Sequence, residues 1–167
     1  MKEALVLVGH GSRLPYSKQL ISDIADEIAK KDKYPIVTYG MMEFNEPSIK
    51  EAIKTVVEQG AKKIIVVPVF LAKGNHTERD IPTILRKEPT ESAKKLMAKK
   101  EAAHDEEGCC GHGHGHGHGH GHGHGHHHDH KSDIIDELPE GVEIVYRDVI
   151  GLDPRLVDIV IDRAEDL

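Results

Sequence analysis

The chain has 167 residues and a formal net charge of −7, which limits the classes of protein to consider. The length suits a single domain, and the negative charge argues against a nucleic-acid partner, which would need a basic surface. No run approaches the roughly 18 apolar residues of a membrane span, and we expect no membrane partner. The start of the chain lacks the pattern of a secretion signal. Cys109 and Cys110 are adjacent and cannot link distant parts of a fold, so a reducing, cytoplasmic location is expected.

The first half of the chain predicts alternating strands and helices. Residues 4–8 are a continuous apolar run ending at Gly9, typical of a strand buried on both faces in a parallel sheet. Residues 16–32 predict a helix whose apolar stripe comprises Leu20, Ile21, Ile24, Ala25 and Ile28. Residues 36–41 predict a second strand. Pro47 suits the first position of the following helix, which stops near Gly60.

The second half continues the alternation. Residues 64–69 predict a third strand, and Asp80 is suited to cap a helix beginning at Ile81. Residues 142–147 predict a fourth strand, and Asp153 precedes a last amphipathic helix. The order βαβαβαβα predicts an α/β fold, a parallel sheet of four strands flanked by helices.

Residues 90–131 interrupt this order as a low-complexity insert before the last strand, within what we otherwise expect to be one domain over residues 1–167. Residues 91–107 are rich in Lys, Ala and Glu and are compatible with a helix, but they show no apolar face. Residues 111–126 alternate Gly and His strictly. Glycine at every second position leaves little to bury, so we expect disorder in this histidine-rich tract.

Two histidines outside the insert follow predicted strands, His10 after the first and His76 in the loop after the third. In a flavodoxin-like strand order of about 2-1-3-4, these strands are neighbours and flank the point where ligands bind. Two imidazoles in one crevice can hold a divalent Ni, Co, Fe or Zn ion and leave coordination positions open. A single histidine at a strand end is more often a hydrogen-bonded loop residue. Gly9 and Gly11 could instead belong to a phosphate-binding loop, although the segment lacks the spacing of the known phosphate-loop motifs.

Four motifs occur in order outside the insert. They are Leu5-Val6-Leu7-Val8-Gly9-His10-Gly11-Ser12-Arg13, Met42-Glu43-Phe44-Asn45-Glu46-Pro47, Val67-Pro68-Val69-Phe70-Leu71-Ala72-Lys73-Gly74-Asn75-His76-Thr77 and Asp80-Ile81-Pro82. In this combination the chain resembles the small class II chelatases, the archaeal single-domain sirohydrochlorin cobaltochelatases, also assigned as nickelochelatases. The similarity spans the chain apart from the insert, and a histidine-rich insert at this place is familiar in the group.

The resemblance implies a chelatase fold, a homodimer and ATP-independent insertion of Co²⁺ or Ni²⁺ into sirohydrochlorin, for cobalamin or coenzyme F430 synthesis. The metal is then a substrate, and no permanently bound cofactor is implied. The metal-binding and proton-accepting histidine of the family corresponds to His10, and the second metal-binding histidine to His76. The substrate-contacting acid corresponds to Glu46, which could alternatively be a helix-start carboxylate. The substrate-contacting loop corresponds to Leu71, Ala72, Lys73, Gly74, Asn75 and His76.

Sirohydrochlorin is rich in carboxylates, so a chain of charge −7 needs local positive groups to bind it. Arg13, Lys73 and the helix N-termini after the first and third strands are the candidates, although both side chains could simply be solvated.

The Gly-His tract admits several interpretations. Its eleven histidines between His112 and His130 suit Ni, Co, Zn or Cu ions, as a metal reservoir, a buffer against metal excess or passive sequence. Cys109 and Cys110 could add soft ligands or be plain exposed thiols. A nickel or cobalt storage protein or metallochaperone would act through the tract alone, and a phosphate-binding regulator would need neither His76 nor Glu46.

Overall fold

The computed structural model describes residues 1–105 and 133–166, so the Gly-His tract and both cysteines lie outside the described residues. The elements follow the predicted alternation, with a π-helical turn and a further helix inserted after the third strand. In chain order they are β1 (Glu3–Gly9), α1 (Tyr16–Ala29), β2 (Ile36–Met41), α2 (Ile49–Glu58), β3 (Lys63–Pro68), η1 (His76–Asp80), α3 (Ile81–Ile84), α4 (Glu91–Asp105), β4 (Glu143–Tyr146) and α5 (Pro154–Ala164).

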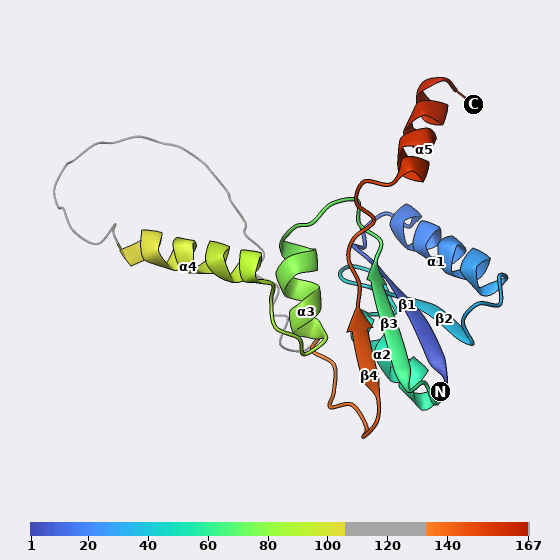
Figure 1. The fold of residues 1–167 in the computed structure, drawn as a ribbon, viewed down its shortest axis with the longest axis horizontal. Helices are drawn as coiled ribbons and strands as arrows, with labels where there is room; N and C mark the ends of the chain where they lie inside the picture. Colours follow the sequence, from blue (N-terminus) through green and yellow to red (C-terminus); the bar gives the residue numbers. More distant parts are fainter. Residues whose placement is uncertain (106–132, 167) are drawn as a thin grey trace.

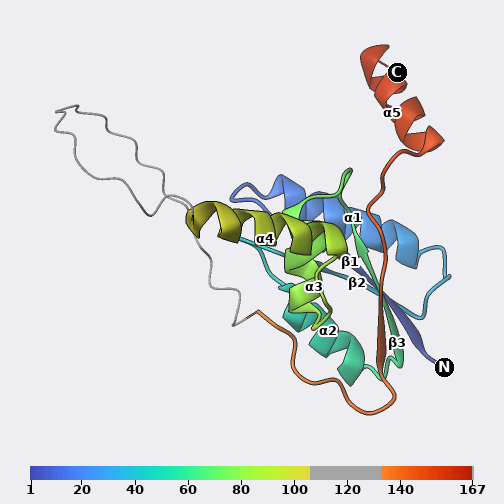
Figure 2. The ribbon, with the colours of Figure 1, turned by 60° about the vertical axis from the view of Figure 1, so that its left-hand side comes forward.

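The four strands form one parallel sheet in the order β2-β1-β3-β4, which confirms the predicted topology. Strand β1 lies between β2 and β3, and Val8 pairs with Gly40 on one side and Pro68 on the other. Helix α1 covers one face of the sheet, whereas α2 and α3 cover the other (Figures 1 and 2). The carboxyl ends of β1 and β3 therefore meet at one edge.

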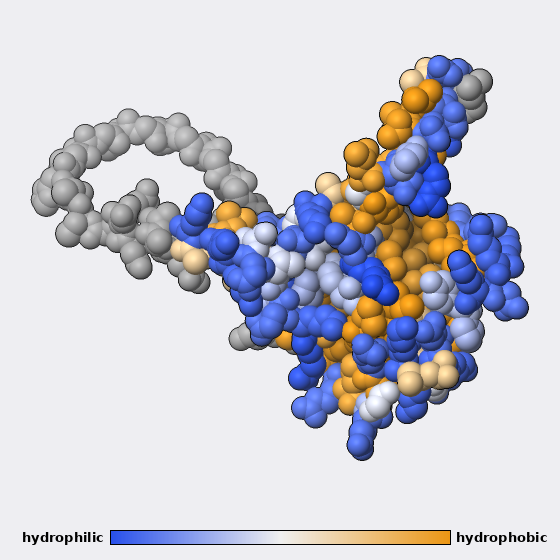
Figure 3. Space-filling view, viewed as in Figure 1, coloured by the Kyte–Doolittle hydropathy of each residue, from blue (hydrophilic) through white to orange (hydrophobic). Residues whose placement is uncertain are grey.

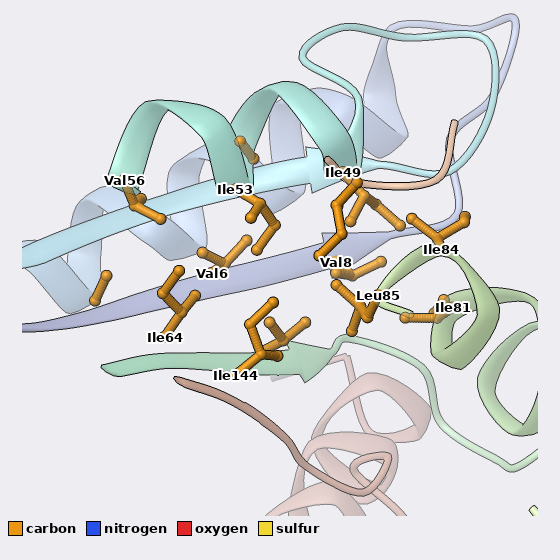
Figure 4. Packing of buried hydrophobic residues seen from close by; sticks show 14 of the residues in the cluster. Val6, Val8, Ile49, Ile53, Val56, Ile64, Ile81, Ile84, Leu85 and Ile144 are labelled. Atoms are coloured by element: carbon orange, nitrogen blue, oxygen red, sulfur yellow. The ribbon is translucent and has the colours of Figure 1, made fainter. Parts of the chain in front are cut away.

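The larger core lies between the sheet and helices α2 and α3 (Figure 4). Val6, Val8, Ile64 and Val66 present fully buried side chains to this side, because alternate residues of a strand face the same way. Helix α2 contributes its apolar stripe to the same core, as its helical spacing predicts, through Ile49, Ala52, Ile53 and Val56.

The smaller core lies under α1, where Leu5, Leu7 and Ile65 pack against Ile21 and Ala25. Strand β1 is therefore buried on both faces, as its continuous apolar run predicts. The predicted stripe of α1 is only partly right, because Leu20 is 60% exposed.

The last helix begins where the sequence predicts, with Asp153 as N-cap and Pro154 in the first turn. None of its residues is buried, and α5 projects from the body of the protein (Figure 1). Within residues 1–105 and 133–166, no helix combines the length and the apolar character needed to cross a membrane.

The start of α2 differs from the prediction that Pro47 takes the first helical position. Ser48 is the N-cap, and its hydroxyl accepts a hydrogen bond from the Glu51 backbone N–H, while the Glu51 carboxylate accepts one from the Ser48 N–H. This capping box satisfies two N–H groups that the helix itself leaves without partners. Pro47 therefore precedes the helix.

Replacing Ser48 with Ala should lower the free energy of unfolding by about 1 kcal/mol, because the side-chain acceptor of the capping box is lost. Ser22→Ala in the middle of α1 is the matched control and should change it by less than ~0.5 kcal/mol. Urea unfolding of both variants measures the difference, and equal effects would contradict a capping role for Ser48.

The loops after β1 and β2 are joined by backbone hydrogen bonds at the edge where His10 lies. The N–H groups of Met42 and Glu43 donate to the carbonyls of Gly9 and His10, at 3.0 and 3.1 Å. Gly11 has a φ of +93°, and a Cβ added to it would lie 1.8 Å from the Glu43 carbonyl oxygen. Only glycine permits this close approach.

Gly11→Ala should therefore destabilise the protein by roughly 2–4 kcal/mol, since two backbone segments must separate and a positive φ is imposed on alanine. Gly74→Ala is the control from the loop after β3, where an added Cβ meets nothing within 4 Å. Denaturant unfolding of the two variants tests this contrast, and a stable Gly11→Ala variant would show that the loops are not held as described.

Candidate functional site

The structure brings His10 and His76 together at the carboxyl edge of the sheet. His10 directly follows β1, and His76 begins the η1 turn after the loop that leaves β3. Their Nε2 atoms lie 3.3 Å apart, and the rings meet at 73° with centroids 4.9 Å apart. Phe70 contacts the His10 ring edge-to-face, with the centroids 6.1 Å apart. The two histidines thus form one site.

Each histidine uses its other ring nitrogen on a group that can only accept a hydrogen bond. His10 Nδ1 lies 3.0 Å from the Gly11 carbonyl oxygen, and His76 Nδ1 lies 2.8 Å from Asp80 Oδ2. Since neither a carbonyl nor a carboxylate can donate, both Nδ1 atoms must carry the proton. In the neutral rings, both Nε2 lone pairs then face each other across 3.3 Å, an arrangement that favours a cation between them.

Asp80 does not have the N-cap role that the sequence predicts. The predicted N-cap is wrong, because Asp80 lies inside a continuous helical turn, has αR backbone angles and makes no cap hydrogen bond. Its carboxylate, 7% exposed, instead receives His76 Nδ1–H and the Arg79 Nε–H, the latter at 2.7 Å. Burial by itself would raise the pKa of Asp80, but the hydrogen bonds from Arg79 and His76 outweigh it and keep the pKa below its usual range.

Two further contacts hold the turn that carries His76. The Tyr146 hydroxyl on β4 donates to the Thr77 carbonyl at 2.9 Å, and the Thr77 hydroxyl lies 2.9 Å from the Gly74 N–H, which donates to it. Burial, supported by Glu78 and Asp148, raises the pKa of Tyr146 far above its usual range, so its phenol remains a donor. Tyr146 lies outside the four sequence motifs, and Thr77 is the last residue of the third motif, in which the sequence indicates no role of its own for it.

Glu46 lies in the loop after β2, beside the His10 loop. The two loops are linked because the Ser12 N–H donates to Asn45 Oδ1 at 2.9 Å. Glu46 is exposed and lines a cavity of about 320 Å³ together with Glu43, Asn45 and Ile84. The carboxylate at the start of α2 is Glu51, so the alternative role of a helix-start acid does not fall on Glu46.

The five residues Leu71, Ala72, Lys73, Gly74 and Asn75 form an exposed loop that leads to His76. Lys73 forms an ion pair with Asp148 at 3.0 Å and lies 3.9 Å from Glu78. A hydrogen bond from Lys73 keeps the pKa of Asp148 below its usual range.

On the opposite side of the site, the Arg13 guanidinium lies over the Phe44 ring, 5.5 Å from its centroid. A cation held on an aromatic face in this way is partly desolvated and available to an anion.

The site offers two protein ligands to a metal ion. In the part of the chain that the structure describes, no group of three or more His, Cys, Asp and Glu side chains is arranged to hold an ion. Two imidazoles fixed from behind by Gly11 and Asp80 leave the remaining coordination positions to water or to another ligand.

Comparison with known proteins gives relatives along the whole chain. The CbiX family model matches residues 4–167. The sirohydrochlorin cobaltochelatase of Methanococcus aeolicus is 57% identical over 98% of both chains, and that of Methanococcus maripaludis is 53% identical over 99% of both.

Among solved structures, the sirohydrochlorin chelatase SirB of Bacillus subtilis subspecies spizizenii, in complex with cobalt, has the same fold, with a TM-score of 0.60 and 23% identity. The match covers all of this chain and 51% of SirB. The chain therefore belongs to the CbiX family, the small, single-domain class II chelatases that its sequence motifs indicate.

Proposed function

We propose that the protein inserts Co²⁺ or Ni²⁺ into sirohydrochlorin without ATP, and that His10 and His76 present the metal. The observation that carries the proposal is the 3.3 Å separation of the two Nε2 atoms. Two imidazole nitrogens bound at ~2.0–2.1 Å to one tetrahedral ion lie about 3.3–3.4 Å apart. The pair is thus spaced for a shared ion before any metal arrives.

The relatives that match along nearly the whole chain are sirohydrochlorin cobaltochelatases, which supports sirohydrochlorin as the substrate and favours cobalt as the metal. Imidazole suits nickel equally well, and Ni²⁺ is the second candidate metal. Cobalt-sirohydrochlorin would serve cobalamin synthesis, and nickel-sirohydrochlorin would serve coenzyme F430 synthesis. The metal is a substrate in either case, and two ligands with open positions suit an ion that must leave.

The reaction exchanges one divalent ion for two pyrrole protons. The neutral His10 ring can accept one proton at Nε2 when the metal moves to the macrocycle, because its Nδ1 already carries a proton donated to Gly11. We propose Glu46 as an orienting group or a relay for the second proton, because it lines the cavity formed by the loop after β2. The buried Asp80 stabilises positive charge on His76 while the ion is bound.

Local positive charge must offset the repulsion between the acidic chain and the carboxylates of the macrocycle. Arg13, on the Phe44 ring, is the group best placed to receive one of them. Lys73 is held by Asp148, so a substrate carboxylate would have to compete for it. The exposed loop of residues 71–75 supplies the rest of the proposed contact surface.

The purified protein should accelerate the spectral change of sirohydrochlorin mixed with Co²⁺, and His10→Ala should reduce the rate to that of the protein-free control, because metal presentation and proton transfer are both lost. His104→Ala is a matched control and should leave the rate unchanged. Deleting residues 111–130 should largely preserve turnover. If deletion abolished the rate and His10→Ala did not, the tract would be the active element.

Replacing Asp80 with Asn should lower kcat/KM for Co²⁺ about 10–100-fold, because the charged partner that orients His76 is lost. Asp23→Asn on the exposed side of α1 changes the net charge equally and should have no effect. Circular dichroism confirms that both variants are folded. Unchanged metallation by folded Asp80→Asn would exclude a positioning role for this carboxylate.

A further inference from the structure

Positive charge is concentrated in one short part of this acidic chain. Residues 86–100 include six basic and two acidic residues, a net charge of +4, so the rest of the chain carries −11. Most of this segment belongs to α4, and Figure 3 shows hydrophilic surface along this helix. A locally basic region in a chain of opposite net charge produces a field of its own, which attracts anions to that place.

Two lysines of α4 carry charge that the protein does not neutralise. Lys94 is not one of them, because it lies 3.3 Å from both Glu88 and Glu91, and hydrogen bonds to these carboxylates raise its pKa. Lys95 and Lys99 are exposed and four residues apart, so they share one face of the helix. In the part of the chain that the structure describes, neither of them forms an ion pair.

The start of α4 is tied to the turn that carries His76. The Thr90 backbone N–H donates to the Glu78 carbonyl at 2.9 Å, and the Thr90 hydroxyl donates to the Glu78 carboxylate at 2.6 Å. The same hydroxyl accepts the Ala93 N–H at 3.3 Å, as the side chain of a helix N-cap does. Glu78 is two residues from His76, so the basic helix begins beside the candidate metal site.

From this anchor α4 extends outward from the body of the protein (Figure 1). With a rise of 1.5 Å per residue, Lys95 and Lys99 lie about 6 and 12 Å along the helix from Glu91. Interactions between exposed charges extend over about 8–10 Å at 0.1–0.15 M salt. The field of the two lysines therefore reaches the space beside the turn of His76, although α4 supplies no ligand to the metal site.

We infer that Lys95 and Lys99 steer a polycarboxylate tetrapyrrole toward the site, an inference that rests on the proposed function. The carboxylates of sirohydrochlorin are repelled by the rest of the chain, and fixed basic groups beside the site reverse this repulsion locally. Such groups raise the association rate constant by about 10-fold or more. A charge at the rim of a site acts on the encounter, so it changes the association rate constant and its salt dependence.

This role differs from that of the cations within the site. Arg13 lies on the Phe44 ring, and Lys73 is paired with Asp148, so each is held at a place where only the bound macrocycle would meet it. The lysines of α4 have no such contact among the described residues, and their charge acts before the macrocycle arrives.

Binding of metal-free sirohydrochlorin tests the inference, because it requires no metal insertion. In stopped-flow fluorescence at ~20 mM salt, the double variant Lys95→Glu, Lys99→Glu should associate about 10-fold more slowly than the wild type. Its dissociation rate constant should be unchanged, and the difference in association should disappear at ~0.5 M salt. The double variant Lys95→Arg, Lys99→Arg retains both charges and should associate at the wild-type rate.

The matched control is Lys31→Glu, Lys33→Glu, an equal change of charge at exposed positions between α1 and β2, at the opposite edge of the sheet. It should leave the association rate constant unchanged. Equal losses in the control and in Lys95→Glu, Lys99→Glu, or an effect on dissociation alone, would overturn the inference and leave the proposed function intact.

The salt dependence of the wild type gives a second measurement. Steering predicts that association slows as salt is added, whereas repulsion by a chain of charge −7 predicts that it accelerates. Acceleration would overturn the inference alone. A wild-type protein that does not bind sirohydrochlorin would overturn both the inference and the proposed function.

Discussion

The central position of β1 is the constraint on which the rest of the structure depends. It is hydrogen-bonded to β2 and β3, and its apolar residues form the middle of both cores. Parallel neighbours end at the same edge of a sheet, so the residue after β1 and the turn after β3 must meet there. The pairing of His10 with His76 therefore follows from the strand order, and the close contact of Gly11 with Glu43 holds the segment that carries His10.

The chemistry of the site is set by what lies behind the two rings. The Gly11 carbonyl and the Asp80 carboxylate accept hydrogen bonds from the two Nδ1–H groups. The lone pairs of both Nε2 atoms are therefore directed toward each other. When both imidazole rings are neutral, the two lone pairs repel each other, and a cation between them would relieve this repulsion. Arg79 donates to the same carboxylate as His76, so the positive charge of Arg79 offsets the negative charge of Asp80 behind the His76 ring. In the proposed function, such a site would hold a metal without a full set of ligands, as transfer to another ligand requires.

The apolar runs predict the strands, whereas the strand order and the meeting of the two histidines follow only from an assumed flavodoxin-like order, which the structure confirms. The predicted N-cap role of Asp80 is wrong. An acid before Ile81-Pro82 matches the N-cap pattern, but the preceding η1 turn places Asp80 inside a continuous helical segment. Its spacing of four residues from His76 was the available signal. The prediction that Pro47 is the first helical residue is also wrong. Ser48 and Glu51 have the spacing of a capping box, which indicates that the helix begins after Ser48. Gly11 and Tyr146 act through contacts between distant segments, which local patterns do not encode.

Periodicity shows that a helix has an apolar face, but it does not identify the surface that covers this face. Within the described residues, nothing buries the residues of α5. The segment leading to α5 is bonded to Phe70 and Leu71, and the Phe70 ring touches His10. A surface that covered α5 would therefore restrain residues 150–153, and through them the loop that carries His76. Ordering of this loop and burial of α5 would then be linked, since each lowers the conformational freedom that the other must remove.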